Sequence, residues 1–214
     1  LGVAMAGITL GNGSNDLLEL VARAFLTPAT EAIYSQHAFA VYPIVTQAVG
    51  ATHVVIPAKN WGHDLDAMAA AVTPRTRLVF IANPNNPTGT WLGHDELYAF
   101  LRGLPDHVIA VLDEAYGEYL DPPPSRTSVD WLDTLPNLLI TRTFSKAYGL
   151  AGLRVGYGLS HPGLADVLNR VRQPFNVNQL ALLAATAALD DDDYLSQSRT
   201  LNPVSYTHLT LPTI

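Results

Sequence analysis

Lys146 lies in surroundings that are unusual for a lysine and that suit chemistry. It belongs to the run Thr143-Phe144-Ser145-Lys146, among small and hydroxyl side chains, and Arg154 follows eight positions later with glycines between them. A surface lysine normally lies among other charged residues, whereas this one follows an apolar run at 138–140. Because burial tunes lysine toward nucleophilic and base roles, Lys146 is a candidate for either.

Two further polar clusters each follow an apolar run. Residues 83–89 read Asn-Pro-Asn-Asn-Pro-Thr-Gly, and residues 113–116 read Asp-Glu-Ala-Tyr. Asp113 could simply cap a turn at the end of a strand, or it could serve as a buried carboxylate in a site.

The glycine-rich turn at 11–16 precedes a predicted helix, with Ser14 or Asn15 as the expected N-cap. Such a turn is either an anion site at a helix N-terminus or an ordinary capped turn. It is not a dinucleotide fingerprint, because Asp16 stands where G-x-G-x-x-G needs its last glycine, and no Walker A sequence occurs in the chain.

The elements that must position these clusters alternate between short apolar strands and helices. Strands are expected at 8–10, 32–34, 52–56, 77–82, 108–112, 138–141 and 155–159, and helices after residue 14, from 41, at 64–72, 95–101, 164–171 and 177–189. This alternation predicts an α/β fold, a three-layer αβα arrangement with a mostly parallel sheet. Ligands of such sheets bind at the C-terminal strand ends, where all the polar clusters should meet.

Composition narrows the classes of function. The net charge of −7, without a basic cluster, argues against a nucleic-acid partner. There is no cysteine, no apolar stretch of membrane-spanning length and no signal sequence, so the cytoplasm is the default location. The seven histidines lack paired metal spacing, and the aspartates at 190–193 are interpreted as a solvated cap at a helix C-terminus, so no metal is expected.

The clusters at 83–89 and 113–116, followed by Ser145-Lys146 and Arg154, together resemble the fold-type I pyridoxal-phosphate aminotransferases. Within that group, the segments 11–18, 37–42 and 85–89 resemble histidinol-phosphate aminotransferases most closely. The resemblance covers about 7–189. It implies pyridoxal 5'-phosphate as cofactor and the large cofactor-binding domain as the fold.

The resemblance also implies roles for individual residues. Lys146 would bind the cofactor aldehyde and move the α-proton, Asp113 would keep the pyridine nitrogen protonated, and Tyr116, the third catalytic residue, would donate to the ring oxygen. Phe39 would stack on the ring, although plain core packing also explains it. The full set of cofactor-binding residues that the resemblance implies is Ser14, Asn15, Phe39, Asn86, Asp113, Tyr116, Thr143, Ser145, Lys146 and Arg154. Asn86 would donate to the ring oxygen, and the phosphate would be held by the backbone at Ser14 and Asn15, the hydroxyls of Thr143 and Ser145, and Arg154.

Some expectations concern the ends of the chain. Because it begins at Leu1, it is expected to be a fragment in which 1–200 form the large domain, without an N-terminal segment and without the small C-terminal domain that binds the substrate carboxylate. Residues 201–214 carry no periodicity and are expected to be a non-native tail. The segment 121–125 is expected to form a stiff surface loop.

The resulting hypothesis is transamination between L-histidinol phosphate and 2-oxoglutarate in histidine biosynthesis by a homodimer that takes a small-molecule amino donor and a 2-oxo acid. The alternatives are an aminotransferase for aromatic or other amino acids, a related decarboxylase of a phosphorylated substrate, and a cofactor-binding effector domain of a transcription regulator. The 214-residue chain on its own is expected to be inactive and poorly soluble.

Overall fold

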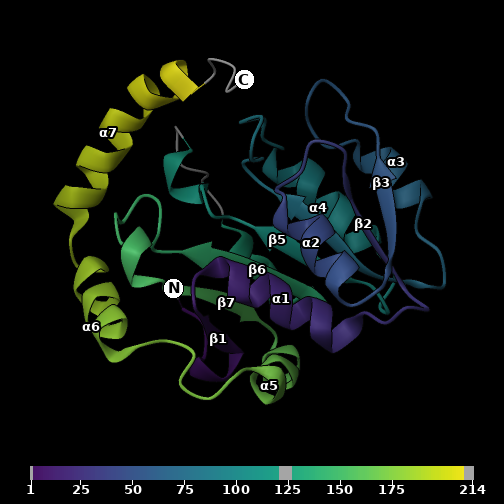
Figure 1. Cartoon of the computed structure of the whole chain (residues 1–214). Helices are drawn as coiled ribbons and strands as arrows, with labels where there is room; N and C mark the ends of the chain where they lie inside the picture. The colour runs from purple at the N-terminus through teal and green to yellow at the C-terminus, as the bar shows by residue number, and fades with distance from the viewer. Residues whose placement is uncertain (1, 121–126, 210–214) are drawn as a thin grey trace.

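A seven-stranded sheet forms the centre of the molecule (Figure 1). A computed structural model describes residues 2–120 and 127–209. The sheet order is β1-β7-β6-β5-β4-β2-β3. The strands are β1 (Ile8–Gly11), β2 (Glu31–Ser35), β3 (Thr52–Ile56), β4 (Thr76–Ala82), β5 (Ile109–Asp113), β6 (Leu138–Thr143) and β7 (Gly156–Ser160).

Only β7 runs against its neighbours among these strands; it pairs antiparallel with both β1 and β6, while the other pairs are parallel. Gly156 at the start of β7 pairs with Gly11 on one side and with Thr143 on the other. The C-terminal ends of β1 and β6 therefore lie at the same edge of the sheet as the start of β7. The predicted α/β fold with a mostly parallel sheet is confirmed.

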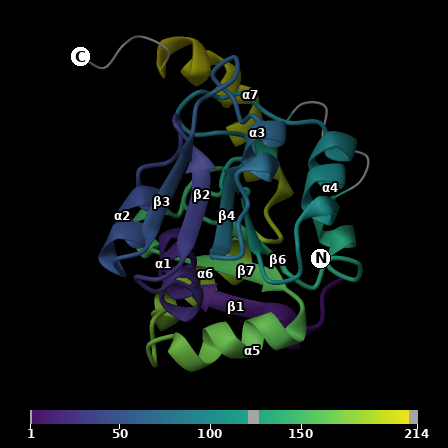
Figure 2. The ribbon, with the colours of Figure 1, turned by 90° about the vertical axis from the view of Figure 1, so that its right-hand side faces the viewer.

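Helices cover both faces of the sheet, which explains why its central strands are almost continuously apolar. The helices are α1 (Ser14–Phe25), α2 (Val41–Ala48), α3 (Leu65–Ala70), α4 (His94–Gly103), α5 (Pro162–Val171), α6 (Gln179–Ala188) and α7 (Asp192–Leu209). Short 3-10 turns lie at Met5–Gly7, Gly117–Tyr119, Ser128–Trp131 and Ala151–Leu153. Figure 2 shows α2 and α4 on opposite sides of the strands.

Two apolar clusters fill the space between these layers. One joins the sheet to α1, α2 and α5 through residues such as Leu17, Tyr42 and Leu168. The other joins it to α3, α4 and α6 through residues such as Met68, Leu101 and Ala185. Burial on both faces fixes the register of the central strands and with it the position of the residues that follow them.

Helix α1 begins differently from the expectation. Gly13, with φ 77°, is its N-cap, so the prediction of Ser14 or Asn15 at that position is wrong. The turn is closed by the backbone N–H of Asn12, which donates to Asp16 Oδ2 at 2.9 Å. Ser14 and Asn15 consequently belong to the first turn of the helix, and their side chains are not used as caps.

The aspartates at 190–193 also lie differently. Helix α6 ends at Ala188, and Asp192 and Asp193 form the first turn of α7, whose start is capped by Asp191 Oδ1 accepting from Tyr194 N–H at 2.9 Å. These carboxylates are exposed as expected, but two of them favour a helix N-terminus rather than a C-terminus.

The ends of the domain remain a prediction. Helix α7 continues to Leu209, and residues 210–214 of the predicted tail, like the predicted loop at 121–125, lie outside the described residues. Within the described ranges, no helix is both long enough and apolar enough to cross a membrane.

Candidate active site

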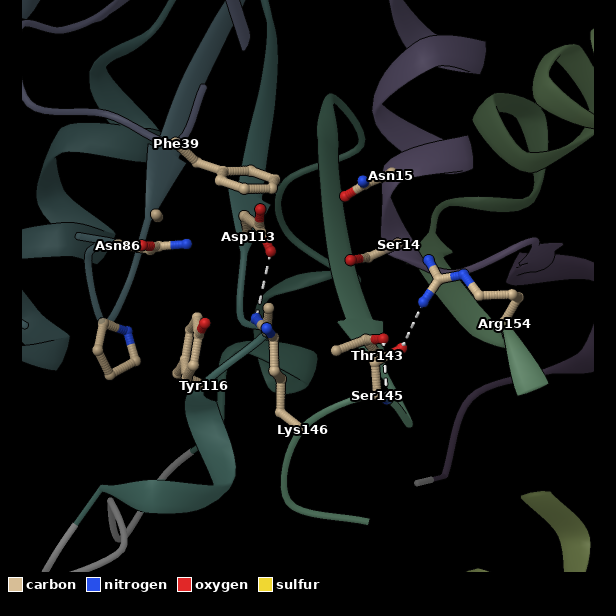
Figure 3. Close-up of a pocket in the computed structure, with 13 residues that line it drawn as sticks. Ser14, Asn15, Phe39, Asn86, Asp113, Tyr116, Thr143, Ser145, Lys146 and Arg154 are labelled. Atoms are coloured by element: carbon tan, nitrogen blue, oxygen red, sulfur yellow. Dashed lines mark hydrogen bonds between the residues drawn. The ribbon is translucent and has the colours of Figure 1, made fainter. Parts of the chain in front are cut away.

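A cavity of about 160 Å³ opens at the C-terminal edge of the sheet (Figure 3). It lies where β4, β5 and β6 end, next to the first turn of α1. Its lining contains all ten residues predicted from the sequence, together with Ala82, Pro84 and Ala115. The folding of the sheet therefore brings together residues that are spread over 141 positions from Ser14 to Arg154.

Lys146 lies in the turn that follows β6. The turn is held by Ser145 N–H, which donates to Thr143 Oγ1 at 3.1 Å, and by Gly149 N–H, which donates to the carbonyl of Lys146 at 2.9 Å. Phe144 and Ala147 are buried on either side, so the turn is anchored in the core while Lys146 itself is exposed to the pocket. Its Nζ lies 5.1 Å from the centre of the Tyr116 ring.

Asp113 ends β5 at the floor of the pocket and is only 4% exposed. Its Oδ1 accepts from the backbone N–H of Ala115 and from the hydroxyl of Thr141, both at 3.2 Å, and its Oδ2 accepts from the hydroxyl of Tyr42 at 3.0 Å. Burial raises the pKa of Asp113, while these three hydrogen bonds lower it by stabilising the carboxylate.

Asn86 is presented by a loop that folds back on itself. Asn85 Nδ2 donates to the carbonyl of His37 at 2.7 Å and to Thr88 Oγ1 at 2.8 Å, and Asn83 exchanges side-chain hydrogen bonds with the backbone of Leu92. These bonds fix the loop so that Asn86 lines the pocket. His37 does not line it; its ring stacks on Trp61 instead.

Phe39 and Tyr116 are aromatic walls of the cavity, and Figure 3 shows them on opposite sides of Asp113. Phe39 packs edge-on against Tyr42, with ring centres 5.9 Å apart. Its ring is thereby fixed from behind while one side remains open to the cavity.

The other end of the pocket is built for an anion. Ser14 and Asn15 come from the first turn of α1, a 12-residue helix whose N-terminus carries partial positive charge. Arg154 Nη1 donates to Ser145 Oγ at 3.3 Å and to the carbonyl of Ala151 at 2.9 Å. Thr143 completes this group, which Figure 3 shows on the side of the pocket away from Asn86.

Two glycines allow this end to form. A Cβ on Gly13 would collide with the guanidinium of Arg154, and a Cβ on Gly156 would lie 2.5 Å from the backbone nitrogen of Ser14. The close approach of β7 to the start of α1 therefore requires glycine, which has no Cβ, at positions 13 and 156.

Sequence reasoning missed Tyr42, Thr141 and Gly156, and it placed Gly13 in the candidate anion-binding turn without its contact with Arg154. Tyr42 reads as a core residue of a helix, and in one dimension nothing connects it to Asp113. Thr141 follows three apolar residues of its strand, and a hydroxyl at that position was only a weak signal of a role in the site. Among the described residues no group of three or more His, Cys, Asp or Glu side chains gathers in a way that could hold a metal ion.

The fold and this pocket define the class of protein: an α/β domain with a polar ligand site at the C-terminal edge of a doubly covered sheet. The model of the family described as aminotransferase class I and II matches residues 3–208. The chain belongs to this family.

Curated relatives refine the comparison. The chain is 68% identical over 201 residues to histidinol-phosphate aminotransferase 2 of Pseudomonas fluorescens, covering 94% of this chain and 54% of the relative. It is 60% identical over 211 residues to histidinol-phosphate aminotransferase 1 of Nitrosococcus oceani, covering 99% and 57%. The chain thus spans about half the length of the curated relatives it matches.

A solved structure is also similar. The crystal structure of histidinol-phosphate aminotransferase from Sinorhizobium meliloti in complex with pyridoxal-5'-phosphate superposes with a TM-score of 0.89 at 35% identity, covering 94% of this chain and 54% of that one.

Proposed function

We propose that the chain is the large cofactor-binding domain of a longer enzyme that transfers an amino group between L-histidinol phosphate and 2-oxoglutarate with pyridoxal phosphate. The observation that carries the proposal is the convergence of Lys146, Asp113 and Arg154 on one cavity in a chain 68% identical to a histidinol-phosphate aminotransferase. The histidine-biosynthetic role follows from the same relatives.

The residues present fit pyridoxal phosphate. This cofactor has a flat ring with a basic nitrogen, a ring oxygen, an aldehyde and a phosphate. The pocket offers an aromatic wall, a buried carboxylate, an amine and an anion-binding end in which added Cβ atoms at Gly13 and Gly156 would interfere. When bound, the cofactor supplies an electron sink for the negative charge that develops on the α-carbon of an amino acid.

The protein groups would divide the work by position. Lys146 would hold the aldehyde group of the cofactor and, as a free amine, would take and return the α-proton of the substrate. Asp113 would hold a proton on the ring nitrogen. Tyr116 and Asn86 would hold the ring oxygen, and Phe39 would lie against the ring face.

The phosphate would be held by the remaining lining residues. Arg154 offers charged N–H donors, and the start of α1 offers backbone N–H groups and the Ser14 hydroxyl. The hydroxyls of Thr143 and Ser145 lie on the same side. These residues would hold the phosphate at the end of the pocket away from Asn86.

Covalent trapping tests the cofactor assignment. The full-length enzyme is incubated with pyridoxal phosphate, reduced with borohydride and digested, and peptides are analysed by mass spectrometry. We expect the pyridoxyl adduct on Lys146 and none in a Lys146→Ala variant. An adduct spread over surface lysines, or none at all, would contradict the assignment.

Single-turnover rates test the substrate. We expect histidinol phosphate to convert the bound cofactor at least about tenfold faster than phenylalanine. Histidinol phosphate carries a phosphate group of its own, and phenylalanine lacks the binding energy that this group provides. Comparable rates would favour a broader amino-acid aminotransferase.

We further propose that the enzyme is a homodimer that works in the cytoplasm, with a small-molecule amino donor and a 2-oxo acid as its partners. Exposed apolar side chains at Phe175, Leu180 and Leu183, which are 97%, 71% and 61% exposed, favour burial against another surface. Light scattering of the full-length enzyme tests the dimer, and cell fractionation tests the location.

The same exposed surface supports the expectation that the 214-residue chain alone is inactive and poorly soluble, which turnover and sedimentation assays would test.

A further inference from the structure

Tyr42 connects two walls of the pocket from behind. It lies in the first turn of α2, is fully buried and stacks on Phe80 of β4 with ring centres 4.8 Å apart and planes 9° apart. Phe39 also packs edge-on against it, with ring centres 5.9 Å apart. This packing leaves the ring no freedom to turn, and its hydroxyl lies 3.0 Å from Asp113 Oδ2.

The direction of this hydrogen bond is set by charge. Burial, followed by the charge of Asp113, raises the pKa of Tyr42 well above its ordinary value, so the hydroxyl keeps its proton and donates it to the carboxylate. Of the hydrogen bonds that lower the pKa of Asp113, the one from Tyr42 has the largest effect. The other groups that act on this carboxylate are Thr141 and the Ala115 N–H on Oδ1 and the charge of Glu114; Lys146 lines the same pocket.

We propose that Tyr42 is a positioning residue of the transamination site. Its hydroxyl keeps Asp113 ionised and directed at the nitrogen of the cofactor ring, and its aromatic side chain holds Phe39 in place against the face of the cofactor. The inference rests on the proposed function and assigns a role to a residue that does not line the cavity.

The proton balance explains why this matters. Asp113 and a ring nitrogen share one proton, which lies on the nitrogen only if the carboxylate is the weaker base. Without the Tyr42 donor the carboxylate would be a stronger base than before, and a proton shared with a bound ring nitrogen would shift toward Asp113 without any net uptake. A neutral ring is a poorer electron sink, so the effect appears in the chemical step rather than in substrate binding.

The test compares Tyr42→Phe with Tyr34→Phe in the full-length enzyme. Tyr34 of β2 is a matched control, because it is also a buried tyrosine and its hydroxyl pairs with His53 Nδ1 at 2.5 Å rather than with Asp113. In the cofactor-free enzyme with ¹³C-labelled aspartate carboxyls, the Asp113 signal is assigned by its loss in Asp113→Asn and followed with pH.

We expect Tyr42→Phe to raise the titration midpoint of Asp113 by about one pH unit or more, a tenfold change in proton affinity, because a hydrogen bond to a charged group is lost. In the loaded enzyme kcat should fall about tenfold or more, while KM stays within about twofold. Tyr34→Phe should change neither quantity. A tyrosine with a fluorinated ring at position 42 is a stronger donor that preserves the packing, so it should lower the midpoint even if Tyr42→Phe fails to fold.

An unchanged midpoint in the Tyr42 variants overturns the inference, as does a shifted midpoint with unchanged kcat. If the Tyr42 variants show the shifted midpoint but the wild-type enzyme binds no pyridoxal phosphate, the proposed function is wrong. The role given to Tyr42 in transamination is then wrong as well.

Discussion

Arg142 and Glu114 form a largely buried ion pair that ties the end of β6 to the residue that follows β5. Arg142 Nε and Nη2 lie 2.9 and 2.8 Å from Glu114 Oε2, and the two side chains are 18% and 14% exposed. Ser128 donates its hydroxyl to the other carboxylate oxygen. The pair lines a second cavity, separate from the pocket that Asp113 and Thr143 line. It therefore braces the two strand ends that carry Asp113 and Lys146.

We expect Arg142→Met to lower the free energy of unfolding by about 3–5 kcal/mol, because Glu114 would be left charged and buried without its partner. Chemical denaturation of the full-length enzyme measures this. Arg170→Met is the control, since its pair with Asp166 is 75% and 58% exposed and should contribute less than about 1 kcal/mol. Equal losses in the two variants would contradict the bracing role.

Glu118 should make stability depend on pH. Burial raises its pKa from 4.5 to about 7, although the charge of Arg142 opposes the shift. A carboxyl whose folded pKa is raised contributes stability below the unfolded value that is lost as pH rises through the folded value. The loss should therefore develop between pH 4.5 and about 7 and reach about 3 kcal/mol at most.

Glu118→Gln isolates this contribution. We expect the variant to match the wild type in denaturation at pH 4.5 and to be the more stable protein at pH 8. Glu96→Gln, at an exposed glutamate, should show no such difference. A constant offset between Glu118→Gln and wild type at both pH values would show that burial of the charge is not the cause.

Gly156→Ala should weaken cofactor binding. The added Cβ would meet backbone atoms of Ser14, Gly13 and Arg142 at 2.5, 2.7 and 2.9 Å, so β7 and the start of α1 must move apart. We expect the Kd for pyridoxal phosphate, measured by fluorescence titration, to rise about tenfold or more. Gly152→Ala, where a Cβ meets nothing within 4 Å, should leave the Kd within about twofold.

Arg154→Lys should remove most of the preference for the phosphorylated cofactor. Lysine keeps the charge but lacks the planar fork, so the hydrogen bond to Ser145 and the paired contacts to a phosphate are lost together. The ratio of Kd values for pyridoxal and pyridoxal phosphate should fall about tenfold or more. A fall in affinity for both molecules alike would mean that Arg154 supports the fold rather than the phosphate.

Much of the fold and the pocket could be predicted because both depend on local patterns. Apolar strands followed by Asp113, by the Asn83–Gly89 loop or by the Lys146 turn must deliver those residues to one edge once the strands are parallel. Where the N-cap of α1 falls could not be predicted, because Gly13 tolerates a positive φ and so displaces Ser14, the better capping residue, into the helix.

Contacts between distant elements were equally hidden. The hydrogen bond from Tyr42 to Asp113 joins residues 71 positions apart. The need for glycine at position 156 arises only because the backbone of Gly13 packs against it in the folded protein. Such relationships depend on how α2 and β7 pack on the sheet, which periodicity does not specify.

The reversed direction of β7 has one more consequence. It makes the stretch between Thr143 and Gly156 a closed loop, because these two residues are paired in the sheet and Phe144 N–H donates to the carbonyl of Val155 at 3.1 Å. The amine of Lys146 and the guanidinium of Arg154 are carried on this one loop, whose ends cannot separate. The distance between the two charged groups therefore depends on the length of this loop. Inserting or deleting a single residue there would change that distance while leaving the sheet pairing of Thr143 with Gly156 in place.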